Sequence, residues 1–258
     1  MITLANELLG AARSSLGTTC VLDTGLGPGA VADLVRLVRP VLTDWKLGWT
    51  SWFICDRGAL VEKITTLREA GGRVIAGGSA AEIAMARGKF LPYLDVCASL
   101  GIGRVEIGEG FIASVPDPEV VVDQARQRDL EVQYETGRKN AAEDAAMSTA
   151  QRIEAARLWI EAGAAQVVFE AREAGVGYAL FRGPNQLNQE LLDQLLARLQ
   201  IERLVFEAPT RETQITLFRT LGPRACIGNV YPHELLRAET IRRLIHADTV
   251  DLQGEDSA

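Results

Sequence analysis

The sequence predicts an α/β protein, a single (β/α)8 TIM barrel with one extra helix at its N-terminus. Eight short apolar segments alternate with helix patterns, and the length of 258 residues is close to that of one such barrel. Three of the segments also end in an aromatic residue followed by a glutamate. An open doubly wound sheet is the alternative, but segment count and chain length together favour the barrel.

The predicted strands are mostly continuous apolar runs, which are typical of parallel strands covered on both faces. In chain order they are Thr19–Asp23, Trp45–Gly48, Arg73–Ala76, Arg104–Ile107, Glu131–Glu135, Gln166–Glu170, Arg203–Glu207 and Ala225–Gly228.

Helix patterns precede the first strand and lie between later ones. They cover Leu4–Arg13, Ala59–Ala70, Ala150–Ala162, Leu187–Gln200 and Thr210–Leu221. We expect Thr210 to cap its helix, Gly163 and Gly222 to end theirs, and Pro232 to open the last helix. No linker or charge block divides the chain, so we expect a single domain over 1–258, with an N-terminal helix in 1–18, the barrel in 19–250 and a frayed tail in 251–258.

Composition narrows the function classes. The net charge of −7 argues against nucleic-acid binding, and no apolar stretch is long enough to span a membrane. The first thirteen residues do not resemble a signal peptide, so we expect a cytoplasmic protein. The four cysteines form no CxxC pair, which argues against a zinc or thioredoxin-type site and favours buried free thiols.

Three glutamates, Glu135, Glu170 and Glu207, end successive strands 35 and 37 residues apart. In a barrel these strand ends build the active site, and we expect the three carboxylates to crowd one rim. Crowded carboxylates repel one another, so one is pushed to protonate unless cations or a hard divalent ion such as Mg²⁺ lie nearby. The simpler alternative is a set of rim salt bridges. The nearby cations are Lys46, Arg138, Lys139 and Arg172.

Glycine turns follow two other strands, at Gly77-Gly78 and at Gly228-Asn229. Each is either a tight turn or a place where the backbone approaches a phosphate. Neither histidine lies at a strand end, so an acid–base step would use lysine or glutamate.

Many short motifs occur in the order seen in phosphosulfolactate synthases, and the chain resembles that family from about Cys20 to Val250. They are Lys46-Leu47-Gly48-Trp49, Gly77-Gly78, Glu106-Ile107, Glu109-Gly110, Glu135-Thr136-Gly137-Arg138-Lys139, Glu170-Ala171-Arg172-Glu173, Glu207-Ala208-Pro209, Gly228-Asn229 and Asp248-Thr249. The family is a (β/α)8 barrel that adds sulfite to phosphoenolpyruvate with Mg²⁺, a step that in methanogens begins one route to coenzyme M.

The resemblance implies a Mg²⁺-dependent carbon–sulfur lyase and suggests a role for each candidate residue. Lys139 would be the general acid or an anion ligand, with Lys46 and Glu106 as further catalytic candidates. Substrate anions would be bound by Arg138, Arg172, Gly77, Gly78, Gly228 and Asn229. Mg²⁺ would be held by Glu135, Glu170 and Glu207.

Some family positions differ in this chain. Thr24 replaces the usual lysine after the first strand, Gly108-Glu109-Gly110 replaces Ser-Asp-Gly, Arg138 replaces a lysine, and Thr213-Gln214 replaces Gln-Gln. The change at Thr24 removes a positive charge, so a relative that adds a different nucleophile is an alternative. A non-catalytic relative resembling the family's plant heat-stress homologues is another. A homo-oligomer is the default expectation for a barrel of this size.

Overall fold

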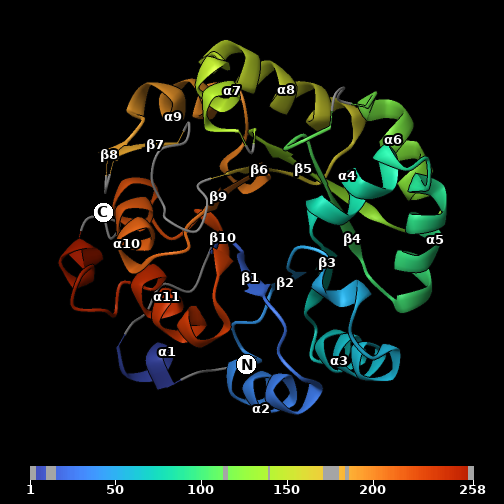
Figure 1. The fold of residues 1–258 in the computed structure, drawn as a ribbon. Coiled ribbons are helices and arrows are strands. Elements are labelled where there is room, and N and C mark those ends of the chain that lie inside the picture. The colour runs from blue at the N-terminus through green and yellow to red at the C-terminus, as the bar shows by residue number, and fades with distance from the viewer. Residues whose placement is uncertain are drawn as a thin grey trace.

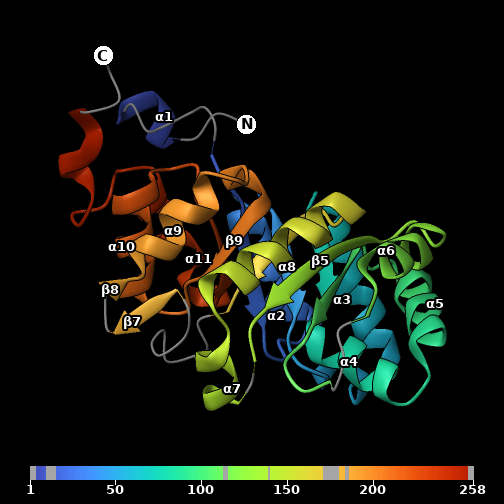
Figure 2. The same ribbon diagram turned by 90° about the horizontal axis from the view of Figure 1, so that it is seen from above.

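The computed structural model describes residues 4–9, 16–112, 116–138, 140–170, 180–183 and 186–254. Parallel strands close into a barrel in the order β1-β10-β9-β6-β5-β4-β3-β2, and helices surround it (Figures 1 and 2). This confirms the predicted (β/α)8 barrel. The barrel strands are β1 (Thr19–Asp23), β2 (Asp44–Leu47), β3 (Arg73–Ala76), β4 (Arg104–Gly108), β5 (Glu131–Thr136), β6 (Gln166–Phe169), β9 (Leu204–Glu207) and β10 (Cys226–Val230).

All eight predicted strands are present, and their ends differ from the prediction by at most two residues. A short antiparallel pair, β7 (Phe181–Gly183) and β8 (Gln186–Leu187), was not predicted. Its second strand includes Leu187, the first residue of a predicted helix. That helix, α9, begins at Gln189 because the Asn188 side chain accepts a hydrogen bond from the Leu191 amide and caps it.

Several outer helices start and stop where local chemistry predicts, whereas others had no predicted range. Thr210 caps α10 in a capping box, and Gly163 ends α8 with a φ of 106°. The helices after the first strand are α2 (Pro28–Val38), α3 (Arg57–Glu69), α4 (Gly78–Ala86), α5 (Phe90–Leu100), α6 (Pro118–Arg126), α7 (Ala141–Ala146), α8 (Thr149–Ala162), α9 (Gln189–Leu196), α10 (Arg211–Leu221) and α11 (Leu235–Arg242).

The chain ends match their predictions only in part. Pro232 begins a short 3-10 turn, Pro232–Glu234, directly before α11. A short helix, α1 (Leu4–Leu8), occupies the start of the predicted Leu4–Arg13 helix, and residues 10–15 lie outside the described part. In the predicted tail, a 3-10 turn covers Val250–Gly254.

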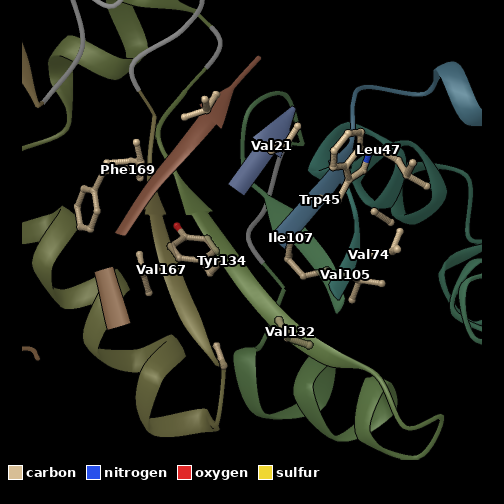
Figure 3. Close-up of a cluster of buried hydrophobic side chains, with 14 of the residues drawn as sticks. Val21, Trp45, Leu47, Val74, Val105, Ile107, Val132, Tyr134, Val167 and Phe169 are labelled. Atoms are coloured by element: carbon tan, nitrogen blue, oxygen red, sulfur yellow. The ribbon is translucent and has the colours of Figure 1, made fainter. Parts of the chain in front are cut away.

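The two faces of each barrel strand have different chemistry. Figure 3 shows one set of side chains, including Trp45, Val105, Tyr134 and Phe169, in the apolar cluster between strands and helices. Their neighbours in sequence point the opposite way, into the barrel. There Val168, Val205 and Cys226 form a small apolar cluster, and the remaining interior positions include many buried polar groups. The prediction of continuous apolar strands missed this polar interior.

The four cysteines are free, as predicted, and three of them are buried. Burial raises the pKa of the Cys97 thiol to about 12 and that of Cys20 further still, so both stay protonated. None of the helices that the structure describes has both the length and the apolar character needed to cross a bilayer.

Candidate active site

Lys46 lies at the centre of the polar interior. This β2 residue is 5% exposed, and its Nζ is 3.3 and 3.2 Å from the two carboxylate oxygens of Glu106 on β4. The same Nζ is 3.5 Å from Oε1 of Glu207 on β9. Because β2 is not a neighbour of either strand, these contacts cross the inside of the barrel.

The surroundings of Lys46 keep it protonated. Burial alone would lower the pKa of its ammonium group, but the carboxylates of Glu106, Glu207 and Glu135 outweigh that effect and hold the pKa well above its usual value. A lysine held in this state is unsuited to be a general base. It is suited to stabilise negative charge that develops on a bound molecule.

Both carboxylate oxygens of Glu106 accept hydrogen bonds. Besides Lys46, its Oε1 accepts a 2.9 Å hydrogen bond from the Gly78 amide and its Oε2 a 2.7 Å bond from the Gln133 side chain. This arrangement favours a role as a fixed counter-ion for Lys46. Because Glu106 accepts from the Gly78 amide, that amide is occupied in this structure, and its predicted contact with a substrate anion stays a prediction.

The other predicted glycine positions also have structural reasons. A Cβ added to Gly77 would lie 2.9 Å from the Leu47 carbonyl oxygen, and one added to Gly228 would lie 3.1 Å from a Val205 methyl group. Close packing against the neighbouring backbone therefore requires glycine at position 77, and it leaves little room for a side chain at position 228. Contact between these positions and a substrate stays a prediction.

Glu135 is the carboxylate with the least favourable surroundings. It is buried, and burial together with the nearby charges of Glu106, Glu207 and Glu170 raises its pKa well above the usual value, against the lowering effect of Lys46. This agrees with the expectation that crowding pushes one of these glutamates towards protonation. Proton uptake by Glu135, or a cation bound beside it, would remove the repulsion between these carboxylates.

Although the three rim glutamates follow strands at the same end of the barrel, they lie at two levels of the sheet: Glu170 is level with Glu207, and Glu135 lies two positions earlier. Glu135 pairs with Val168, and Thr136 pairs with Phe169. Glu170 follows Phe169 and is therefore level with Gly137, beyond Glu135; a Cβ added at Gly137 would lie 3.2 Å from the Glu170 carboxylate. The equal spacing of aromatic–glutamate runs in sequence does not reveal this stagger between strands.

Asn229 is brought to the site by an irregularity in β10. The pairing of β1 with β10 shifts by one residue at Gly228-Asn229, and Asn229 adopts a φ of 54°. Such bulges re-aim side chains near functional sites. Here the Asn229 amide donates a hydrogen bond to Glu207. Asn229 thus orients a carboxylate, and its predicted contact with a substrate anion stays a prediction.

Arg138 links two loops at the same end of the barrel. Its guanidinium group donates to the Glu109 carbonyl oxygen at 2.7 Å and lies 3.6 Å from the Glu109 carboxylate, and its backbone amide donates to Asp144 at 2.9 Å. Asp144 also forms a buried 3.0 Å ion pair with Arg152. Lys139 and Arg172, two of the predicted site residues, lie outside the described residues.

Several polar residues that complete the site were not predicted from the sequence. The sequence did not indicate Gln133 and Arg104 as site residues, because both lie in strands that were predicted to be apolar. Glu82 is fully buried on α4, where it accepts a 2.8 Å hydrogen bond from the Phe111 amide. Asp144 lies on α7, a short helix that was not predicted. The sequence signal for such a residue is a polar position that alternates with apolar ones in a strand, as at Gln133.

The carboxylates fit Mg²⁺ in chemistry but do not form a closed cage. Mg²⁺ prefers oxygen ligands and is often held by one or two carboxylates together with substrate oxygens. Among the residues that the structure describes, no group of three or more histidine, cysteine, aspartate or glutamate side chains is close enough to hold a metal. Binding by Glu135, Glu170 and Glu207 therefore stays a prediction, in which the substrate supplies further oxygens.

Comparison with known proteins shows which family this sequence resembles. Residues 11–248 match the family model described as (2R)-phospho-3-sulfolactate synthase. The chain is 31% identical over 234 residues to the phosphosulfolactate synthase of Methanocaldococcus jannaschii, covering 90% of this chain and 93% of that relative. It is 26% identical over 235 residues to the phosphosulfolactate synthase of Bacillus subtilis, covering 90% of this chain and 92% of that relative.

Solved structures share the barrel at low identity. A 3-hexulose-6-phosphate synthase from Salmonella typhimurium matches with a TM-score of 0.55 at 11% identity, covering 89% of this chain and 100% of that one. A truncated 3-deoxy-D-arabino-heptulosonate 7-phosphate synthase from Thermotoga maritima matches with a TM-score of 0.54 at 9% identity, covering 90% of this chain and 86% of that one. At such identities the likeness shows the fold alone.

Proposed function

We propose, because the chain belongs to the (2R)-phospho-3-sulfolactate synthase family, that this protein is a Mg²⁺-dependent lyase that adds sulfite to phosphoenolpyruvate and forms (2R)-phospho-3-sulfolactate. The observation that carries the proposal is the buried Lys46 ammonium, kept protonated by three carboxylates at the end of the barrel where active sites form.

The proposed reaction requires positive charge at a fixed place. The sulfite sulfur forms a bond to the methylene carbon, the electron pair of the carbon–carbon double bond moves towards the carboxylate, and an enediolate forms. Lys46 would stabilise that charge, since a preorganised cation in a dry site is effective there. A general acid then protonates the adjacent carbon, and we propose Lys139 for this step.

The charge balance of the interior supports a metal requirement. Glu106, Glu135 and Glu207 all lie near one ammonium group, so a multiply charged anion would be repelled without further cations. Mg²⁺ bound by Glu135, Glu170 and Glu207 and by substrate oxygens would supply that charge. Arg138 and Arg172 are the proposed ligands of the substrate's anionic groups, because guanidinium groups suit bidentate contact.

The direct test incubates the purified protein with phosphoenolpyruvate, sulfite and Mg²⁺ and follows the loss of enol absorbance, with product identification by mass spectrometry. We expect loss of absorbance only when all three are present. Thermal stabilisation by phosphoenolpyruvate without sulfite-dependent turnover would favour a different nucleophile. That second candidate is supported by Thr24, an exposed residue where the family usually has lysine. If the protein shows no turnover and phosphoenolpyruvate does not stabilise it, the proposal is overturned.

A further inference from the structure

Beneath the Lys46–Glu106 pair, a row of buried polar side chains extends into the barrel. Gln133 on β5 donates to Glu106 at 2.7 Å and accepts from Arg104 on β4 at 3.3 Å. Arg104 also donates to Gln166 on β6 at 2.6 Å. The guanidinium group of Arg104 is anchored on Glu131 at 2.6 and 2.9 Å.

The direction of the Gln133 amide follows from the chemistry of its partners. Arginine has donors and no acceptor, so the group that faces Arg104 must be the amide oxygen. The amide nitrogen therefore faces Glu106, where a carboxylate can only accept. Arg104, itself fixed by Glu131, thus sets the orientation in which Gln133 donates to Glu106.

This contact matters because several carboxylates compete for one ammonium group. Glu106, Glu207 and Glu135 all attract the Nζ of Lys46. The position of Nζ is decided by which carboxylate is held most firmly. Glu106 is held from one side by the Gly78 amide and from below by Gln133.

We propose that Gln133 is a positioning residue: it fixes the carboxylate of Glu106 and, through it, places the Lys46 ammonium group for the reaction. The inference deepens the proposed function and rests on it. Gln133 itself need not touch the substrate. Its loss would leave Lys46 charged but free to move towards Glu207 or Glu135, where it would stabilise developing charge less well.

Gln166 offers a matched control. It is also a buried interior glutamine bonded to Arg104, and its amide nitrogen donates to the Glu202 carbonyl oxygen at 3.1 Å. Both Gln133→Met and Gln166→Met should therefore lower stability to a similar degree. We expect only Gln133→Met to lower kcat, by about tenfold or more, with KM for phosphoenolpyruvate changed by less than about threefold.

A double mutant shows whether Gln133 acts through Glu106. In a Glu106→Gln background, the additional Gln133→Met change should lower kcat by less than about twofold, because residues that act as a unit are not additive. If Gln133→Met does not fold, Gln133→Asn serves instead. It keeps an amide but is one methylene too short to reach both partners, so the same loss of kcat is expected.

The deciding experiment combines kinetics with crystal structures of the wild type, Gln133→Met and Gln166→Met proteins. The Lys46–Glu106 contacts of 3.2 and 3.3 Å should remain in Gln166→Met and lengthen or vanish in Gln133→Met. Unchanged contacts in Gln133→Met, or an equal loss of kcat in both variants, would overturn the inference. If the wild type does not turn over phosphoenolpyruvate and sulfite, the proposed function fails, while the structures still test the role of Gln133.

Discussion

Glu106 and Glu135 are the same residue type, buried on neighbouring strands, and yet their surroundings are opposite. Glu106 accepts hydrogen bonds from Lys46, Gly78 and Gln133. Glu135 is crowded by other carboxylates, and burial with this crowding raises its pKa well above the usual 4.5. The first therefore has a hydrogen-bond donor on each carboxylate oxygen, whereas ionisation of the second opposes folding.

This contrast predicts opposite effects of one substitution. A raised folded-state pKa means that the stability contribution of Glu135 is fully present below about pH 4.5 and is lost as pH rises through the raised value. In metal-free buffer, Glu135→Gln should thus be more stable than wild type at pH 7 and show a flatter pH profile. Glu106→Gln should be less stable by about 3 kcal/mol, since it breaks a buried ion pair.

Urea unfolding measured between pH 4.5 and pH 8 checks both variants on one scale. The account of the two glutamates would be wrong if Glu135→Gln were destabilised across that range, or if the two variants behaved alike.

Single residues also show which parts of the site can be predicted from the sequence. Glu135 and Glu207 could be predicted as site residues because each ends a strand, and both are buried at the polar interior. Gln133 and Arg104 could not be predicted in their roles, because one contacts Glu106 across a strand pair and the other reaches Gln166 two strands away. Such contacts depend on strand order and stagger, which a local sequence pattern does not contain.

Among the elements, the turn after β5 is tightly constrained by its backbone and its neighbours. Gly137 has a φ of 136°, and a Cβ there would lie 3.2 Å from Glu170 and 3.3 Å from Asp144. Asp144 in turn accepts from the Arg138 amide. Backbone conformation and neighbouring carboxylates therefore both require glycine at this position.

Gly137→Ala should consequently lower stability by more than about 1 kcal/mol and raise KM for an anionic substrate, because the turn carrying Arg138 must shift. Gly222→Ala is the control: its φ is 70°, but nothing lies within 4 Å of an added Cβ. We expect it to lose about 1 to 3 kcal/mol, because its ψ of −171° at positive φ is a conformation essentially restricted to glycine, with unchanged KM. Thermal unfolding and steady-state kinetics measure both. Equal KM values in the two variants would argue against a role for this turn.

The eight barrel strands and several helices followed from the sequence to within a few residues, since apolar strand runs, caps such as Thr210 and stops such as Gly163 are local signals. Helices α2, α4, α5, α6 and α7 had no predicted ranges. The β7–β8 pair was missed because its strands are very short, and Leu187 of β8 also fits the helix pattern that follows.

In the whole molecule, the barrel places an apolar layer outside its strands and a charged site inside them. Closure of the sheet brings Lys46 from β2 opposite Glu207 from β9. The outer layer holds a second buried lysine, Lys63 on α3, whose Nζ is 2.7 Å from Asp23. Two buried lysines with carboxylate partners thus lie on different sides of the same sheet, and only Lys46 belongs to the proposed site.

The most direct test of the account compares turnover of phosphoenolpyruvate and sulfite, with Mg²⁺, by the wild type, Lys46→Met and Lys63→Met proteins, each shown to be folded by circular dichroism. Both variants should lose about 3 kcal/mol or more of stability, because each leaves a buried carboxylate without its cation. We predict that Lys46→Met lowers kcat by about 100-fold or more, while Lys63→Met stays within about threefold of wild type. A Lys46→Met protein with wild-type kcat, or an equal loss in both variants, would contradict the central role of Lys46.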